Sequence, residues 1–446
     1  MRTRGRSIVV GLVIGLLAIG SSVRADTAAT DGLKPGDVLD QSNWQRAENL
    51  MPPEILKHYK DGEYKNKISS WPTNVYTWPA DFDAGTKQNA GKFKIGPSGE
   101  VLDKASGKQP DFIIGFPFPQ IDPSDPTAAV QVVWNFFYRT YYFGSLRAES
   151  AVIMLNPGSL ERRLDVIVDF MYYDGVPQEE RVANPNNFNY QQLVFVTSPA
   201  DVHGTQALTW RYRDPSKRDS SWAYVPALRR VRAVSPANRS DGFLGSDMSQ
   251  DDGPFFDGKP EDFTWKLTGE TEQLRIVDPM NLEGKSRNDW MPQGGWRANW
   301  PDMPFIGYMD PQWKGVAWAP IAAGLAKRPF YRVEGVPKDK YYLYGKIELF
   351  LDKIGFQGSW NRKYSWKGEV LNTTQVMAWN PQEVTRPNGQ KDWVQGSNQA
   401  FQCSEALKLN RATVAGIKSS PLSGFDGRVK FDPSHFALDS MSRYGK

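Results

Sequence analysis

Cysteine and histidine are scarce in this chain, and their scarcity removes several classes of chemistry. A single cysteine, Cys403, among 446 residues excludes an intramolecular disulfide, so the fold must be stabilised by burial alone. The three histidines, His58, His203 and His435, have no neighbour at a metal-ligand spacing such as HExxH. The GxSxG elbow, the Walker A loop and the dinucleotide-binding GxGxxG pattern are missing as well. The sequence therefore predicts neither an enzyme nor a cofactor site.

Long hydrophobic runs are also lacking. The apolar run from Ile8 to Gly20 would rise only about 20 Å as a helix, which is shorter than a hydrocarbon core of about 30 Å. It follows three arginines and precedes the small residues Val23 and Ala25, as in a secretory signal peptide. We therefore predict that residues 1–25 form a cleaved signal peptide and that the mature protein is periplasmic.

Net charge is absent once that segment is set aside. The four arginines of residues 1–25 account for the whole excess of 54 basic over 50 acidic residues. A balanced mature chain gives no electrostatic reason to expect nucleic acid as a partner.

Aromatic residues, glycine and proline are abundant instead, with 16 Trp, 18 Tyr, 23 Phe, 39 Gly and 32 Pro. This composition favours strands and turns over helical bundles. From about Ala151 onward, apolar residues recur with a period of two in short segments bounded by turn residues. The first candidate strands are 164–173, 191–197, 205–213, 221–225, 261–271 and 274–278, and others follow residue 328. The pattern predicts a mainly β (α+β) protein with a large antiparallel sheet or barrel.

The predicted organisation has two parts after the signal peptide. Residues 26–145 read as a helical and loop-rich extension that packs on the barrel, and residues 146–446 as a curved antiparallel β domain. A Trp-, Pro- and Gly-rich insertion interrupts the β domain at about 284–328. Within the extension, a helix begins after Asp125 and carries too many aromatic residues for a one-sided surface helix. We expect this helix to be packed on two sides or lodged over an opening.

Several predicted strands are apolar on both faces. In the segment Ser221–Val225, the bulky Trp222 and Tyr224 alternate with residues that are also uncharged. A sheet with one face in water would show clean polar alternation. The pattern therefore predicts a strongly curved sheet whose apolar concave side is covered, or filled, by something else.

The candidate ligand-binding residues are strand aromatics and the cationic corner that follows them: Trp210, Trp222, Tyr224, Arg229 and Arg232. The aromatic rings would offer a large, stiff apolar surface at a small cost in rotamer entropy. The guanidinium groups would stand at the mouth of a cavity and could meet a phosphate or carboxylate. A second interpretation, equally open, makes these arginines surface partners of Asp247 and Asp251.

A glycine-bearing loop follows the corner and carries four acids, Asp241, Asp247, Asp251 and Asp252. Carboxylates are ligands for Ca²⁺, but this loop lacks the fixed one-three-five spacing of a calcium site. We favour a solvated loop, or salt bridges to Arg229, Arg230, Arg232 and Arg239, over a metal.

The stretch from Trp222 to Asp252 closely resembles the signature of periplasmic outer-membrane lipoprotein-sorting-like proteins. In that pattern a Trp-x-Tyr-x-Pro-Ala strand leads into arginines and a Gly-Ser-Asp loop with a following acid. The matching residues are Trp222, Tyr224, Pro226, Ala227, Arg229, Arg230, Arg232, Gly245, Ser246, Asp247 and Asp251. GFPFP at 115–119, followed by the helix with Trp134 and Asn135, resembles one uncharacterised domain-of-unknown-function branch of proteobacterial secreted proteins.

This resemblance implies an incomplete, strongly curved antiparallel barrel with helices over its open mouth and an apolar concave face that receives acyl chains. It implies a non-enzymatic periplasmic carrier of a lipid or other hydrophobic molecule, without a cofactor, acting in envelope lipid or lipoprotein traffic. Its implied partners are an inner-membrane transporter of the resistance-nodulation-division type and an outer-membrane protein.

Two alternatives come from other functional classes. A non-binding scaffold of an envelope transport complex would show a large exposed apolar patch in place of a cavity. A carbohydrate-active enzyme or sugar-binding protein would use a stacking surface from Trp290, Trp296 or Trp300, and the enzyme would add a carboxylate pair. Aromatic packing within the long insertion at about 284–328 would explain the same tryptophans.

Overall fold

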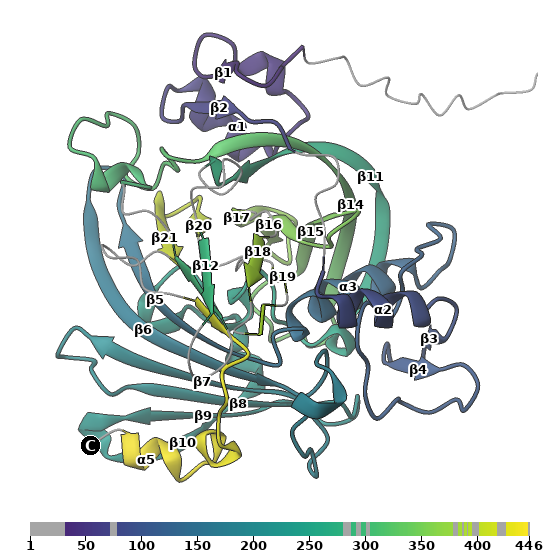
Figure 1. The fold of residues 1–446 in the computed structure, drawn as a ribbon. Coiled ribbons are helices and arrows are strands. Elements are labelled where there is room, and N and C mark those ends of the chain that lie inside the picture. The colour runs from purple at the N-terminus through teal and green to yellow at the C-terminus, as the bar shows by residue number, and fades with distance from the viewer. Residues whose placement is uncertain are drawn as a thin grey trace, which may run out of the picture.

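The computed structural model describes residues 32–71, 78–279, 287–290, 296–299, 304–377, 382–385, 388–389, 391–394, 401–416 and 425–444. Their dominant feature is an 18-stranded, almost wholly antiparallel sheet that curves strongly around an interior (Figure 1). The predicted mainly β fold is therefore confirmed. The predicted signal peptide and parts of the insertion at 284–328 lie outside the described residues. No helix in the described ranges is both long enough and apolar enough to cross a membrane.

The first half of the sheet is built from six successive strands joined by hairpins. They are β5 (Ser145–Leu155), β6 (Leu160–Tyr172), β7 (Phe188–Ser198), β8 (Gln206–Tyr212), β9 (Ser220–Val225) and β10 (Arg230–Val234). Each pairs antiparallel with the next, and β10 pairs with β9 alone among the described strands. This half therefore ends in an edge strand.

The second half of the sheet comes from the C-terminal part of the chain. Its strands are β11 (Phe263–Val277), β14 (Gly324–Pro337), β15 (Lys346–Asp352), β16 (Gly358–Tyr364), β17 (Val370–Val376), β20 (Gln402–Ala406) and β21 (Arg411–Ala415). β21 pairs with β5 and so joins the two halves. The predicted segments 261–271 and 274–278 form one strand, β11, because the backbone stays extended between them and pairs with β14 throughout.

The remaining elements are short. The small strands are β1 (Val38–Leu39), β2 (Asn66–Ile68), β3 (Phe93–Ile95), β4 (Val101–Asp103), β12 (Arg287–Trp290), β13 (Trp296–Asn299), β18 (Gln382–Thr385), β19 (Lys391–Val394) and β22 (Phe425–Gly427). The α-helices among the described residues are α1 (Pro53–Lys60), α2 (Ala80–Gln88), α3 (Ala128–Tyr141) and α5 (Ser440–Tyr444), and several short 3-10 helices lie in the loops.

Helix α3 fills part of the interior, as its aromatic sequence predicts. Most of its residues are buried. On one side Trp134 donates from Nε1 to the Gly99 carbonyl over 2.8 Å, which ties α3 to the N-terminal extension. On the other side the Phe136 ring lies 5.5 Å from the Phe255 ring. α3 is therefore packed between the extension and the interior of the sheet.

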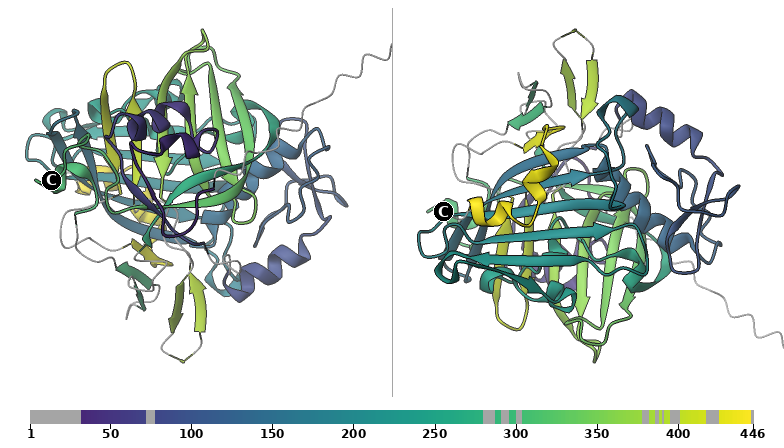
Figure 2. Two further views of the ribbon diagram at one scale, coloured as in Figure 1. Left: turned by 90° about the horizontal axis from the view of Figure 1, so that it is seen from above. Right: turned by 90° about the horizontal axis from the view of Figure 1, so that it is seen from below.

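The convex face of the sheet is covered by the two ends of the described chain. Residues 32–71, including α1, lie outside β17 and β20 (Figure 1). The C-terminal segment 431–444, with α5, lies across the outside of β7 to β10 (Figure 2). The two covering segments therefore lie on the convex face and do not occupy the concave face.

A buried histidine attaches the N-terminal cover to the sheet. His58 on α1 lies 2.6 Å from Glu63 through Nδ1 and 2.7 Å from Glu405 on β20 through Nε2. Burial alone would lower the pKa of His58, but its hydrogen bonds and charge interactions with Glu405 and Glu63 outweigh burial and raise it. The imidazolium is therefore favoured in the folded protein.

We expect the stabilising effect of His58 to depend on pH. Because its folded-state pKa lies above the unfolded value of 6.5, the contribution is complete below that value and is lost as the pH rises through the folded-state pKa. The wild type should therefore exceed His58→Gln in free energy of unfolding more at about pH 6 than at about pH 8.5. Urea unfolding at both pH values measures this, with the exposed His203→Gln as control. A wild-type advantage that grows with pH would contradict the prediction.

Candidate functional site

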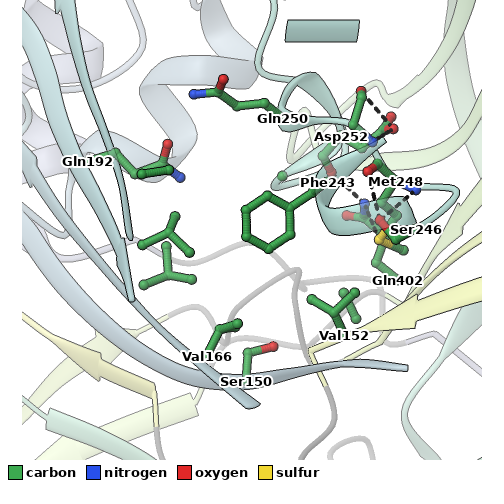
Figure 3. Close-up of a pocket in the computed structure, with 16 residues that line it drawn as sticks. Ser150, Val152, Val166, Gln192, Phe243, Ser246, Met248, Gln250, Asp252 and Gln402 are labelled. Carbon is green, nitrogen blue, oxygen red and sulfur yellow. Dashed lines mark hydrogen bonds between the residues drawn. The ribbon is translucent and has the colours of Figure 1, made fainter. Parts of the chain in front are cut away.

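The concave face of β5 to β8 is not completely filled. A cavity of about 160 Å³, open to solvent on one side, lies between these strands and residues 243–253 (Figure 3). The strand wall is aliphatic and consists of Val152, Val166, Val168, Val194 and Ala207.

Strand register brings these aliphatic residues together. Val168 on β6 lies opposite Val194 on β7, and Val194 lies opposite Ala207 on β8. Directly opposite residues of an antiparallel pair point to the same face, so the three side chains form one row across the concave surface. All three are only half-buried, because the row faces the cavity.

Residues 243–253, which we call the covering loop, form the other wall of the cavity. The Phe243 ring points into the cavity from this covering loop (Figure 3). The Phe243 amide donates to the Met248 carbonyl over 2.7 Å, which closes the loop on itself. Ser249 and Asp252 form a reciprocal capping box around the next turn. The covering loop is therefore an ordered lid that presents an aromatic ring to the valine row.

The polar groups of the cavity are mostly uncharged. Gln192 and Gln250 place their side-chain amides on the side of the cavity opposite to Val152 (Figure 3). The amide of Gln250 donates to the Thr209 hydroxyl over 2.6 Å. Three serine hydroxyls, from Ser150, Ser246 and Ser249, also belong to the lining. Asp252 is the single ionisable residue among the lining residues, and it is paired with Lys363. The cavity can therefore surround an apolar group with hydrogen-bonding groups at its side.

Salt bridges hold the covering loop and its flanks in place. Arg239 lies 2.6 Å from Asp251, 2.8 Å from Asp257 and 3.3 Å from Asp219, and its side chain is 6% exposed. Burial alone would raise the pKa of Asp219, but the neighbouring arginines Arg211 and Arg239 outweigh burial and lower it. The preference for salt bridges is thus confirmed for Arg239.

The other acids of the loop are divided among distant partners. Asp247 pairs with Arg411 over 2.8 Å, Asp252 pairs with Lys363, and Asp241 is exposed. The arginine corner supplies none of these bonds. No group of three or more potential metal ligands occurs within the described ranges.

The predicted aromatic residues Trp210, Trp222 and Tyr224 lie on the opposite, convex face. Strand alternation separates them from the cavity, because Trp222 lies opposite Leu208 while the cavity residue Ala207 lies opposite Ala223. Trp210 donates from Nε1 to the carbonyl of Phe436 over 2.9 Å, and its ring lies 4.6 Å from that of Trp222. The three side chains therefore pack under the C-terminal segment, and ligand binding by them stays a prediction.

The predicted cationic corner is a turn followed by a strand. Arg229 occupies the turn with a φ of 48°, and Arg230 and Arg232 belong to β10. All three arginines are exposed. The corner continues as a strand because the alternating sequence Arg-Val-Arg-Ala-Val is itself a strand pattern.

Cys403 and Trp290, a tryptophan of the insertion, pack within the fold. Cys403 is buried on β20, and burial raises the pKa of its thiol well above the usual value, as an inert packed thiol requires. Trp290 on β12 packs partly buried against the hydrophobic core. The side chain of Trp296 and all of Trp300 lie outside the described residues.

Sequence reasoning missed the cavity valines and the covering Phe243. Val168 and Val194 lie in the predicted strands 164–173 and 191–197, and nothing in their alternation shows that the space beside them is open. The signal for the covering loop was present, because Gly245, Ser246 and Asp247 belong to the quoted signature.

Comparison with known proteins shows several similar chains. An uncharacterized protein of Pseudomonas aeruginosa is 22% identical over 355 residues, covering 77% of this chain and 70% of that one. A putative outer membrane lipoprotein-sorting protein domain from Vibrio parahaemolyticus superposes with a TM-score of 0.46 at 14% identity, covering 72% of this chain and all of that one. A DUF1329 family protein from Desulfovibrio piger gives a TM-score of 0.42 at 15% identity, covering 70% and 98%.

The family resemblance seen in the sequence is confirmed by a family model. Residues 38–296 match the model described as a protein of unknown function, DUF1329. The match spans more than half of the chain and includes β5 to β10 and the covering loop. The chain belongs to the DUF1329 family.

Proposed function

We propose that the protein is a non-enzymatic periplasmic carrier that binds a lipid or another hydrophobic molecule in the cavity under the covering loop. The observation that carries this proposal is the incompletely covered apolar wall. Val152, Val168 and Val194 are only half-buried, although they face inward, and Phe243 stands across from them. Apolar surface that faces solvent within a concave site favours an apolar ligand.

Burial of an apolar chain in this cavity contributes favourably to binding without any charged contact. Each methylene group removed from water contributes about 0.8 kcal/mol. A segment of six methylenes would thus contribute about 5 kcal/mol before the entropy cost of binding. The serine and glutamine groups of the lining can orient a polar end of the ligand, and no chemical step is required of them.

We place this binding in envelope lipid or lipoprotein traffic, beside an inner-membrane transporter and an outer-membrane protein. The support is the sequence signature between Trp222 and Asp252 and the predicted signal peptide at residues 1–25. The structure adds one consistent feature, since the signature forms the strand and covering loop next to the cavity. Residues 243–253 cover the cavity in which the cargo would lie.

Mass spectrometry of the native cargo tests the proposal. The protein is purified gently from its native envelope, extracted with organic solvent, and the released molecules are quantified. We expect a lipid-like molecule in stoichiometric amount. A protein that is empty and also fails to take up apolar fluorescent probes would refute the carrier function and favour a scaffold.

A further inference from the structure

The aliphatic row of the cavity continues across the sheet to an arginine. Beyond Val194 and Ala207, the next residue in register is Ala223 on β9, and Arg232 on the edge strand β10 lies opposite Ala223. Directly opposite residues share a face, so the Arg232 side chain leaves the sheet on the concave side. Arg232 therefore stands on the same surface as the cavity.

A second arginine shares this position. Arg230 lies opposite Val225, two residues along the same strands, and therefore also points to the concave side. Val225 is 38% exposed, so apolar surface lies directly beside this arginine. With strands about 4.8 Å apart, the Cα atom of Arg232 is about 10 Å from that of the cavity residue Ala207. An extended arginine side chain covers more than half of that distance.

The two arginines have no carboxylate partner among the described residues. Both side chains are exposed. The buried acids of the covering loop already have basic partners elsewhere in the fold. The apolar cavity thus shares its face of the sheet with two cations that no described carboxylate neutralises.

We propose that the ligand is an anionic amphiphile, with its hydrocarbon chain in the cavity and its carboxylate or phosphate group at Arg230 and Arg232. This inference rests on the proposed carrier function and specifies its cargo. A guanidinium group binds carboxylate and phosphate oxygens through paired hydrogen bonds, and these are stronger than neutral hydrogen bonds. The lining fits the chain end, because its single ionisable residue, Asp252, is an acid already paired with Lys363, so an anion placed there would meet no free counter-charge among the lining residues.

Three fluorescent probes of similar chain length test the proposal. They are an NBD-labelled dodecanoic acid, its methyl ester, and an NBD-labelled lysophosphatidic acid. The double variant R230Q/R232Q should bind at least one of the two anionic probes about tenfold more weakly and bind the ester as the wild type does. The difference should shrink at high salt, because exposed charges are screened. R443Q is a control for a charge change on the other face, since it removes a positive charge from α5, which lies behind β10 on the convex face.

The outcomes separate this inference from the carrier function itself. Weaker binding of the fatty acid alone, or of the lysophosphatidic acid alone, supports the inference and identifies carboxylate or phosphate as the head group. Equal effects on ester and anions, or equal effects of R443Q, would overturn it while leaving the carrier function in place. Failure of the wild type to bind any of the three probes would refute the carrier function.

Discussion

Replacement of Val194 by glutamate is expected to weaken the binding of apolar and anionic probes by at least about a hundredfold while the protein stays folded. Val194 is half-buried, and its side chain borders the cavity, so a longer side chain has room without displacing the core. A bound chain would enclose the new carboxylate against neighbouring valines. Burial of an unpaired charge costs several kcal/mol, and about 2.7 kcal/mol already corresponds to a hundredfold change in Kd.

Phe195 supplies a matched control for this substitution. It is the next residue of β7, is also half-buried, and points to the convex face beside His203. Phe195→Glu should therefore bind the probes as the wild type does. Circular dichroism and urea unfolding establish that both variants are folded. Full binding by Val194→Glu would show that the ligand lies elsewhere, and the convex-face aromatics Trp210, Trp222 and Tyr224 would then be the next site to test.

The strands were predictable because a half-buried strand carries its own signal. The segments 164–173, 191–197 and 221–225 lie within or beside β6, β7 and β9 to within a few residues. The signal is the alternation of side chains, and alternation assigns residues to two faces without saying which face is concave. Trp222 and Tyr224 were therefore assigned to the cavity, although the structure has Ala223 on that side.

The contacts of the covering loop could not be predicted, because they join distant parts of the chain. Asp247 pairs with Arg411, and Asp252 pairs with Lys363, each across more than a hundred residues. The expected partners were the nearby arginines, of which Arg239 alone takes this role. Proximity in sequence is a poor guide in an antiparallel sheet, since curvature brings its two halves face to face (Figure 1).

The cavity could not be predicted from the sequence. A valine in a filled core and a valine beside a cavity have the same β propensity and the same place in a period of two. What distinguishes Val168 and Val194 is the volume occupied by other segments, chiefly α3 and the covering loop. α3 fills the interior near Phe255, and residues 243–253 fill the space over β5 to β8 only in part. The cavity is thus a property of packing between elements.

Removal of the Arg239 charge is expected to destabilise the protein by about 3–5 kcal/mol, because it leaves buried carboxylates without their partner. Arg239→Met preserves most of the side-chain volume, so the loss reports charge and hydrogen bonding. The variant keeps Asp219, Asp251 and Asp257 close together, with Arg211 as the remaining arginine of the cluster. Urea unfolding at pH 7 measures the difference in free energy. The exposed Arg443→Met should change it by no more than about 0.5 kcal/mol.

The pH dependence of this loss identifies its cause. Burial raises the pKa of Asp257 even with both arginines present, and removal of one cation should raise it further. A carboxylate whose folded-state pKa is raised destabilises the fold above that pKa, so the deficit of Arg239→Met should shrink as the pH falls towards about 5. A deficit below about 1 kcal/mol at pH 7, or one that grows in acid, would mean that apolar contacts hold the covering loop. If Arg239→Met loses the full amount of about 3–5 kcal/mol in free energy of unfolding at pH 7, amide hydrogen exchange in residues 243–253 should also be faster than in the wild type. The reason is that the bond between Arg239 and Asp251 holds the segment that covers the cavity.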